Sequence, residues 1–287
     1  MLKKVLLLLL RGLIPLLITA LFMKFISLNI SYAVIVGVIS LFSISYFLKE
    51  NGIPLFWRVL LLSGPIILGF YALIINELPS VWIALPLFIL ATFLGVLDVT
   101  HYRKNLLGLG LLIVTGLVSF MILPNMITDD LIKDVSKPSP EYQLLNLDEK
   151  SSINKEALKG KIVVIDFFGT WCRPCISEME ELEKVKEYFK DNSNILFAIA
   201  CTDVGGDTPK KAVKFKNDRN LPFMLLYDEK SSVHKSFGFT GVPALTLIDK
   251  KGNIRLTHQG YNEAEMLSER LISIIDKIAN EGVQIEN

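Results

Sequence analysis

Two cysteines, Cys172 and Cys175, stand two residues apart in a chain that has only three cysteines. Three cysteines are too few for a disulfide scaffold. A single C-x-x-C with no second C-x-x-C or histidine pair nearby is also a poor zinc site, because structural zinc takes four ligands. Reversible thiol–disulfide chemistry is therefore the better interpretation, and two buried, unreactive thiols are the alternative.

The elements around the pair favour reactivity. Residues 162–168 form a continuous apolar run, as in a central strand buried on both faces. Residues 173–190 have the apolar spacing of a helix with one buried stripe. Cys172 then lies at a helix N-terminus, where the unpaired N–H groups favour a thiolate and lower the pKa below about 8.5. Cys175, one turn deeper, can close a disulfide with Cys172.

The rest of the C-terminal half alternates in the manner of a mixed α/β domain. A second buried strand is predicted at 195–201 and a surface helix at 208–217. Residues 243–248 and 254–259 are separated by a turn signal and predict a hairpin, and 263–280 predict an amphipathic helix.

Composition separates a membrane half from this soluble half. The chain carries 30 Lys+Arg against 29 Asp+Glu, and no basic stretch suggests a nucleic-acid partner. The 51% hydrophobic residues are concentrated in residues 1–128. We therefore expect a helical transmembrane domain over 1–128 in a lipid bilayer, a polar linker over 129–140 and a soluble domain over 141–287.

About five spans fit the apolar stretches, each close to the roughly 20 residues needed to cross a bilayer. They are predicted at 5–28, 30–48, 56–75, 80–97 and 106–127. Basic residues gather at alternate ends of these spans, at Lys3 and Lys4, at Lys49 and Arg58, and at Arg103 and Lys104. With the positive side inside, the N-terminus is cytoplasmic and the soluble domain lies outside the cell (inner or cytoplasmic) membrane.

Residues 140–261 resemble the TlpA/ResA-type thiol-disulfide oxidoreductases, which are membrane-anchored members of the thioredoxin superfamily. The matching segments are 140–144, 158–175, 241–243 and 247–254. The resemblance implies a thioredoxin-like fold, with a mixed central sheet flanked by helices. It does not extend to the membrane half.

The resemblance also implies a substrate-binding surface beside the cysteines. Trp171 belongs to it, the backbone of Val242 pairs with a substrate polypeptide, and Pro243 is cis and lies against the Cys172 sulfur. An ordinary turn proline is the alternative for Pro243.

Two carboxylates match acids that such proteins use. Asp166 corresponds to the buried acid that moves a proton to or from the second cysteine; an edge-strand residue facing solvent is the alternative. Glu178 corresponds to an acid beside the active site, but it lies on a helix rich in exposed glutamates and could be one of them. Glu180 stands where many relatives have a helix-kinking proline, which puts the bend of the helix in doubt.

Other candidates are weaker. Cys201 ends a buried strand and is expected to be an inert thiol, with a resolving role as the alternative. His234 and His258 are expected at the surface or in turns, and His101 in a cytoplasmic loop. No metal or cofactor is predicted.

The leading functional hypothesis is an enzyme, a protein-disulfide reductase that acts on the thiols and disulfides of exported proteins. Cytochrome c apoproteins are the substrates that the resemblance suggests, with a membrane electron donor for re-reduction. A disulfide-forming oxidase and a redox or partner-binding membrane module without turnover are the alternatives. Residues 1–128 contain no cysteine and cannot relay electrons through disulfides, so they serve as an anchor or as a quinone- or partner-binding module.

Overall fold

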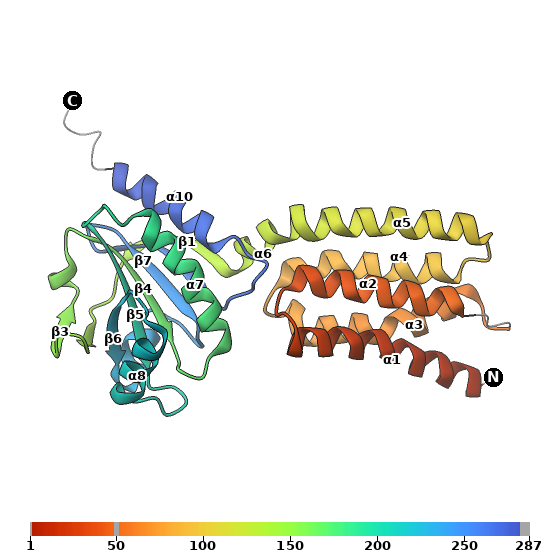
Figure 1. Ribbon diagram of the computed structural model, residues 1–287, viewed down its shortest axis with the longest axis horizontal. Helices are drawn as coiled ribbons and strands as arrows, with labels where there is room; N and C mark the ends of the chain where they lie inside the picture. Colours follow the sequence, from red (N-terminus) through yellow and green to blue (C-terminus); the bar gives the residue numbers. More distant parts are fainter. Residues whose placement is uncertain (1, 49–51, 282–287) are drawn as a thin grey trace. The chain divides into compact units, whose positions relative to one another are not determined.

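The computed structural model describes residues 2–48 and 52–281 (Figure 1). The chain divides into two compact units, one of residues 1–130 with 262–265 and one of residues 131–261 with 266–287. Lys49, which the orientation argument uses, lies outside the described residues.

The first unit is helical. Its elements are α1 (Leu2–Phe25), α2 (Ile30–Phe47), α3 (Leu55–Phe70) with a π-helical turn to Ile75, a 3-10 turn (Pro79–Ile83), α4 (Ala84–Val96), α5 (His101–Leu117), a further π-helical turn (Val118–Ile122) and α6 (Leu123–Leu131). In the part of the chain that the structure describes, five helical stretches are long and apolar enough to cross a membrane: Leu2–Phe25, Ile30–Phe47, Leu55–Ile75, Pro79–Val96 and His101–Leu131. The last begins at His101, so His101, which is expected in a loop, lies with Arg103 and Lys104 in the first turn of a helix.

Small residues let two of these helices approach closely. A Cβ on Gly95 of α4 would lie 2.5 Å from the Cβ of Ser45 on α2, and one on Gly37 would lie 2.8 Å from the ring of Phe88. Close backbone approach of this kind increases van der Waals contact, which stabilises helix pairs where no hydrophobic driving force acts between them.

The second unit is built on one eight-stranded mixed sheet with the order β1-β8-β7-β4-β5-β6-β2-β3. The strands are β1 (Ile132–Pro138), β2 (Gln143–Asn146), β3 (Ser151–Asn154), β4 (Ile162–Phe168), β5 (Ile195–Thr202), β6 (Met224–Asp228), β7 (Ala244–Ile248) and β8 (Asn253–Gln259). β4, β5 and β6 are parallel, and β7 is antiparallel to β4. All seven residues of β4 are buried, as its continuous apolar run predicts.

Helices cover both faces of this sheet (Figure 1). One face, which carries Val164, Phe168 and Leu256, packs against α7 (Arg173–Tyr188), α8 (Pro209–Arg219) and α10 (Leu267–Asn280). The other face packs against the short α9 (Ser232–Ser236) and the aromatic residues Phe237 and Phe239 that follow it. The expected fold class, apolar helices followed by a mixed sheet flanked by helices, is confirmed.

The prediction of a polar linker over 129–140 is wrong. Its first residues continue α6, and Ile132–Pro138 form β1, which pairs antiparallel with β8. β1 is an edge strand, and edge strands tolerate charged residues and proline because one side of the ladder faces no neighbour. The Lys, Asp and Pro content that suggests a linker is therefore compatible with this strand. The C-terminal helix also begins later than expected, at Leu267.

Candidate active site

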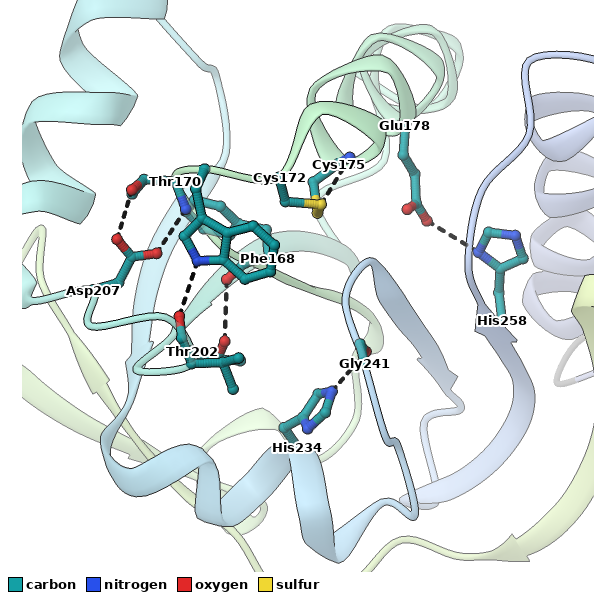
Figure 2. The surroundings of a disulfide bond; sticks show 12 residues. Phe168, Thr170, Cys172, Cys175, Glu178, Thr202, Asp207, His234, Gly241 and His258 are labelled. Atoms are coloured by element: carbon teal, nitrogen blue, oxygen red, sulfur yellow. Dashed lines mark hydrogen bonds and ion pairs between the residues drawn. A yellow bond between two sulfur atoms is a disulfide. The ribbon is translucent and has the colours of Figure 1, made fainter. Parts of the chain in front are cut away.

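The two cysteines lie where β4 leads into α7. Cys172 is the N-cap residue of α7, and its sulfur accepts a hydrogen bond from the backbone N–H of Cys175 at 3.2 Å. The two residues form a disulfide with their Cα atoms 5.3 Å apart (Figure 2). Pro174 occupies the first turn, where its missing N–H is not needed by the helix. Cys172 is 3% exposed and Cys175 is fully buried.

The loop between β4 and Cys172 is held by the segment that follows β5. The carboxylate of Asp207 accepts hydrogen bonds from the Thr170 backbone N–H at 2.7 Å and from its hydroxyl at 2.6 Å (Figure 2). The Trp171 indole N–H donates to the Val204 carbonyl at 3.0 Å, while the side chain remains 56% exposed. The Trp171 ring fills the space where Gly205, at φ +77°, would carry a Cβ. These contacts fix the orientation of Trp171, an exposed aromatic residue that directly precedes Cys172 in the sequence.

A second backbone segment reaches the same end of the sheet. Phe167 of β4 pairs with Ala244 of β7, so the start of β7 lies beside the end of β4. The Val242–Pro243 bond just before β7 is cis, in agreement with the resemblance. The His234 ring nitrogen Nε2 lies 2.9 Å from the Gly241 carbonyl oxygen (Figure 2). His234 is buried, so its expected place at the surface is wrong.

Asp166 lies in the middle of the sheet. It is fully buried on β4 between β5 and β7, which rules out the edge-strand alternative. Neither carboxylate oxygen has a hydrogen-bond partner among the described residues. Burial first, and then the nearby charge of Glu178, raise the pKa of Asp166 well above its usual range, while His258 acts in the opposite direction.

Glu178 faces the protein interior. It lies on α7 three residues after Cys175 and is fully buried, so the solvated alternative is wrong. Its Oε1 lies 3.0 Å from Nδ1 of His258, and Figure 2 shows the two side chains pointing toward each other. His258 is itself fully buried on β8, which corrects its expected surface position.

Cys201 is also buried, next to Phe168 across the parallel pair of β4 and β5. Burial, with a smaller contribution from the charge of Asp207, raises the pKa of its thiol to about 12. It is therefore a protonated, unreactive thiol at neutral pH. Within residues 2–48 and 52–281, no group of three or more His, Cys, Asp or Glu side chains is arranged to hold a metal ion.

Sequence reasoning overlooked Asp207 and His258. Asp207 follows a Gly-Gly pair in a loop, and no spacing links it to Thr170, 37 residues earlier. His258 did leave a signal. It follows Ile254 and Leu256 at two-residue spacing on a predicted strand, which places all three on one face.

Comparison with known proteins identifies relatives of the C-terminal half of the chain. The AhpC/TSA family matches residues 135–257. The thiol-disulfide oxidoreductase ResA of Bacillus thuringiensis is 30% identical over 165 residues, which cover 57% of this chain and 92% of that protein. The thioredoxin-like protein YneN of Bacillus subtilis is 26% identical over 171 residues, with 59% and 97% covered.

A solved structure was matched over the same half of the chain. The crystal structure of a thiol:disulfide interchange protein of the thioredoxin family from Chlorobium tepidum has a TM-score of 0.41 and 18% identity. The match covers 51% of this chain and 98% of that one.

Proposed function

The chain belongs to the ResA family of thiol-disulfide oxidoreductases, and from this membership we propose that it is a membrane-anchored protein-disulfide reductase acting outside the cytoplasm. Its substrates are disulfides of exported proteins, with cytochrome c apoproteins as the class that the family resemblance favours. The observation that carries the proposal is the place of Cys172, whose sulfur caps α7 and accepts the Cys175 N–H.

This place suits Cys172 to be the nucleophile. In the reduced protein, the Cys172 thiolate is stabilised by the helix N-terminus and attacks one sulfur of a substrate disulfide. The substrate S–S bond breaks, a mixed disulfide forms, and the first substrate thiolate leaves and takes a proton from solvent. Trp171, Val242 and Pro243 form the surface that receives the substrate polypeptide.

Cys175 then completes the reaction. Its thiol gives up a proton to the Asp166 carboxylate and attacks the Cys172 sulfur. The Cys172–Cys175 disulfide forms, and the second substrate thiolate leaves. The substrate has gained two electrons, and the protein has lost two. A dithiol of a membrane electron donor restores the reduced protein by the reverse exchange.

The buried carboxylates favour the reducing direction. Asp166 and Glu178 are both buried behind the cysteines, and negative charge there destabilises a thiolate in the reduced protein. A less stable reduced form corresponds to a lower reduction potential, which suits a reductant. Arg173 acts in the other direction and favours an oxidase, but it is exposed, so solvent and salt screen its charge.

The helical unit serves as an anchor in this proposal. Five spans place the chain ends on opposite sides of a bilayer. Lys3, Lys4, Arg103 and Lys104 mark the cytoplasmic side by the positive-inside rule, which places the sheet domain outside. A quinone- or partner-binding role for this unit is the second possibility.

The reduction potential of the full-length protein in detergent tests the proposal. Equilibration in thiol buffers, with the Cys172→Ser variant as the control without a disulfide, is expected to give a value near or below roughly −270 mV. A value near roughly −120 mV would identify an oxidase instead. A disulfide that forms but transfers no electrons to protein substrates would leave only the binding module.

A further inference from the structure

Three ionisable side chains meet behind the cysteines. The register pairs Asp166 of β4 with Leu245 of β7, and Leu245 in turn with His258 of β8. Directly opposed residues on antiparallel strands point to the same face. Asp166 and His258 therefore lie in one row on the face that α7 covers, separated by the apolar Leu245.

Glu178 lies on α7 and adds a third side chain to this row. Cys175, Glu178 and Leu182 follow one another at one-turn spacing and are all buried toward the sheet. The Glu178 carboxylate reaches His258 with 3.0 Å between Oε1 and Nδ1 (Figure 2). The charge of Glu178 raises the pKa of Asp166, and the charge of His258 lowers it. The row thus links the strand under the cysteines to the helix that carries them.

We propose that His258 is a positioning residue that keeps Glu178 ionised and oriented, so that the exchangeable proton of the site resides on Asp166. This inference rests on the proposed function and adds to it the separate roles of the two carboxyl groups: Glu178 stays ionised, and Asp166 carries the exchangeable proton. His258 acts through Glu178.

The hydrogen-bond partners of Glu178 and Asp166 indicate which carboxyl group is ionised and which is protonated. A buried ion is tolerated when an opposite charge and a hydrogen-bond donor accompany it. Glu178 has both in a protonated His258. The charge of His258 also acts on Asp166, but Asp166 has no hydrogen-bond donor among the described residues, since both of its oxygens are buried without a hydrogen-bond partner. Two charged carboxylates and one imidazolium would leave a net negative charge in the interior, and a proton on Asp166 removes it.

Among the described residues, the charged side chains that β1 and α10 bring near this row are exposed or paired. β1 sets the apolar Ile132 opposite His258, and its Lys133 and Asp134 are exposed. α10 covers the row with Leu267, Leu271 and Ile275, while its Arg270 pairs with Asp134. The disulfide cysteines on α7 titrate only after reduction, and the buried thiol of Cys201 in the same core stays protonated at neutral pH, because burial raises its pKa to about 12.

We expect the Glu178–His258 pair to affect the basicity of Asp166. The negative charge on Glu178 raises the proton affinity of Asp166, which makes Asp166 a stronger base toward the Cys175 thiol. Without His258, Glu178 becomes protonated and this effect is lost. In many active sites, the surroundings raise the pKa of one acid above that of another. The two groups can then act as acid and base.

Infrared spectroscopy of the full-length, oxidised protein in lipid nanodiscs tests the assignment at neutral pH. The C=O band of a buried protonated carboxyl group is expected in the wild type. It should vanish in Asp166→Asn. In His258→Gln a second such band should appear, and Glu178→Gln in that background should remove it. Glu183→Gln, on the exposed side of α7, is the matched control and should change nothing.

Persistence of the wild-type band in Asp166→Asn overturns the proposal, and so does the absence of a second band in His258→Gln. If His258→Gln does not fold, His258→Asn replaces it, and the wild-type assignment alone remains decisive. This measurement needs no turnover, so it can fail while the exchange activity persists. Conversely, an inactive disulfide would contradict the proposed function without moving the bands.

Kinetics provide the second readout. His258→Gln is expected to slow resolution of a mixed disulfide about tenfold at pH 7, and to cost nothing further in the Glu178→Gln background. A residue that only stabilises the fold would slow both backgrounds equally, and that result would also overturn the proposal.

Discussion

Asp207 and Thr170 are joined by two hydrogen bonds, one to the backbone N–H and one to the hydroxyl, across 37 residues of sequence. The carboxylate is 4% exposed, so water does not replace these bonds when they are lost. The Asp207 carbonyl is also fixed, because it accepts a hydrogen bond from the Tyr227 hydroxyl at 3.0 Å. The loop that presents Trp171 and Cys172 is therefore held by a side chain from the β5–α8 connection.

Asp207→Ala is expected to destabilise the protein by about 2–3 kcal/mol, because two bonds to a buried carboxylate are lost and their donors are left unpaired. Asp207→Asn should cost less, since its amide keeps one acceptor. The melting temperature of the full-length protein in detergent measures both. Asp218→Ala, which removes an exposed pair with Lys214, is the control and should have little effect. Equal melting temperatures for the Asp207→Ala and Asp218→Ala variants would contradict this account.

Cys201 should resist alkylation. With a thiol pKa of about 12, it carries almost no thiolate at pH 8. After reduction of the native full-length protein, mass spectrometry should therefore find no iodoacetamide adduct on Cys201, and should find one only after unfolding. Cys201→Ala should leave the reduction potential unchanged. An adduct on Cys201 of the native protein would show that this thiol is reactive.

Asp166 should make stability depend on pH. Its pKa is raised on folding, so the native state binds more protons than the unfolded state at pH values above about 4. The contribution of Asp166 to stability is thus complete below that pH and is lost as the pH rises toward the folded pKa. The slope is at most about 1.4 kcal/mol per pH unit.

Asp166→Asn does not titrate, so its melting temperature relative to the wild type should rise between pH 5 and pH 8. Thermal unfolding in detergent at a series of pH values checks this. Glu183→Gln, on the exposed face of α7, should show no such trend. A difference between Asp166→Asn and wild type that stays constant with pH would mean that Asp166 is ionised in the folded protein.

Cys175→Ser should trap mixed disulfides. Cys172 can still attack a substrate, but no second thiol resolves the intermediate. Covalent complexes with exported proteins should accumulate on non-reducing gels and disappear on reduction. Cys172→Ser should trap few or none, because Cys175 is fully buried. Equal trapping by the two variants would show that the roles of the cysteines are not divided as proposed.

The membrane orientation can be tested with single cysteines in a background that lacks the native three. Asn76→Cys and Asp98→Cys lie at exposed positions between successive spans. A maleimide that does not cross membranes should label Asn76→Cys in intact cells and Asp98→Cys only after lysis. The reverse pattern would place the sheet domain in the cytoplasm.

Much of the catalytic geometry could be predicted because it is local. The apolar run of β4 places Asp166 in the interior, and the strand–loop–helix order places Cys172 at a helix N-terminus. Both predictions depend only on residues in the strand and the helix that adjoin the Cys172–Cys175 motif. The sequence leaves Glu178 open between the active site and the exposed face of its helix, and the structure decides between them because Glu178 is buried.

What could not be predicted depends on pairing between distant segments. The partner of Glu178 is His258, 80 residues later, and the register of three strands decides that they meet. The strand β1 was overlooked because its composition resembles that of a linker, and only its position at the sheet edge makes that composition acceptable. Single-sequence patterns contain neither register nor strand order.

β1 has a consequence for how the redox domain could be released. α6 ends at Leu131 and β1 begins at Ile132, so no spare residues separate the last helix from the sheet. A protease that cut within 132–138 would strip β1 from the sheet and bare the backbone of β8, including the position of His258. Such an unpaired edge invites aggregation. Shedding of a freely diffusing, intact enzyme is therefore disfavoured by the fold itself.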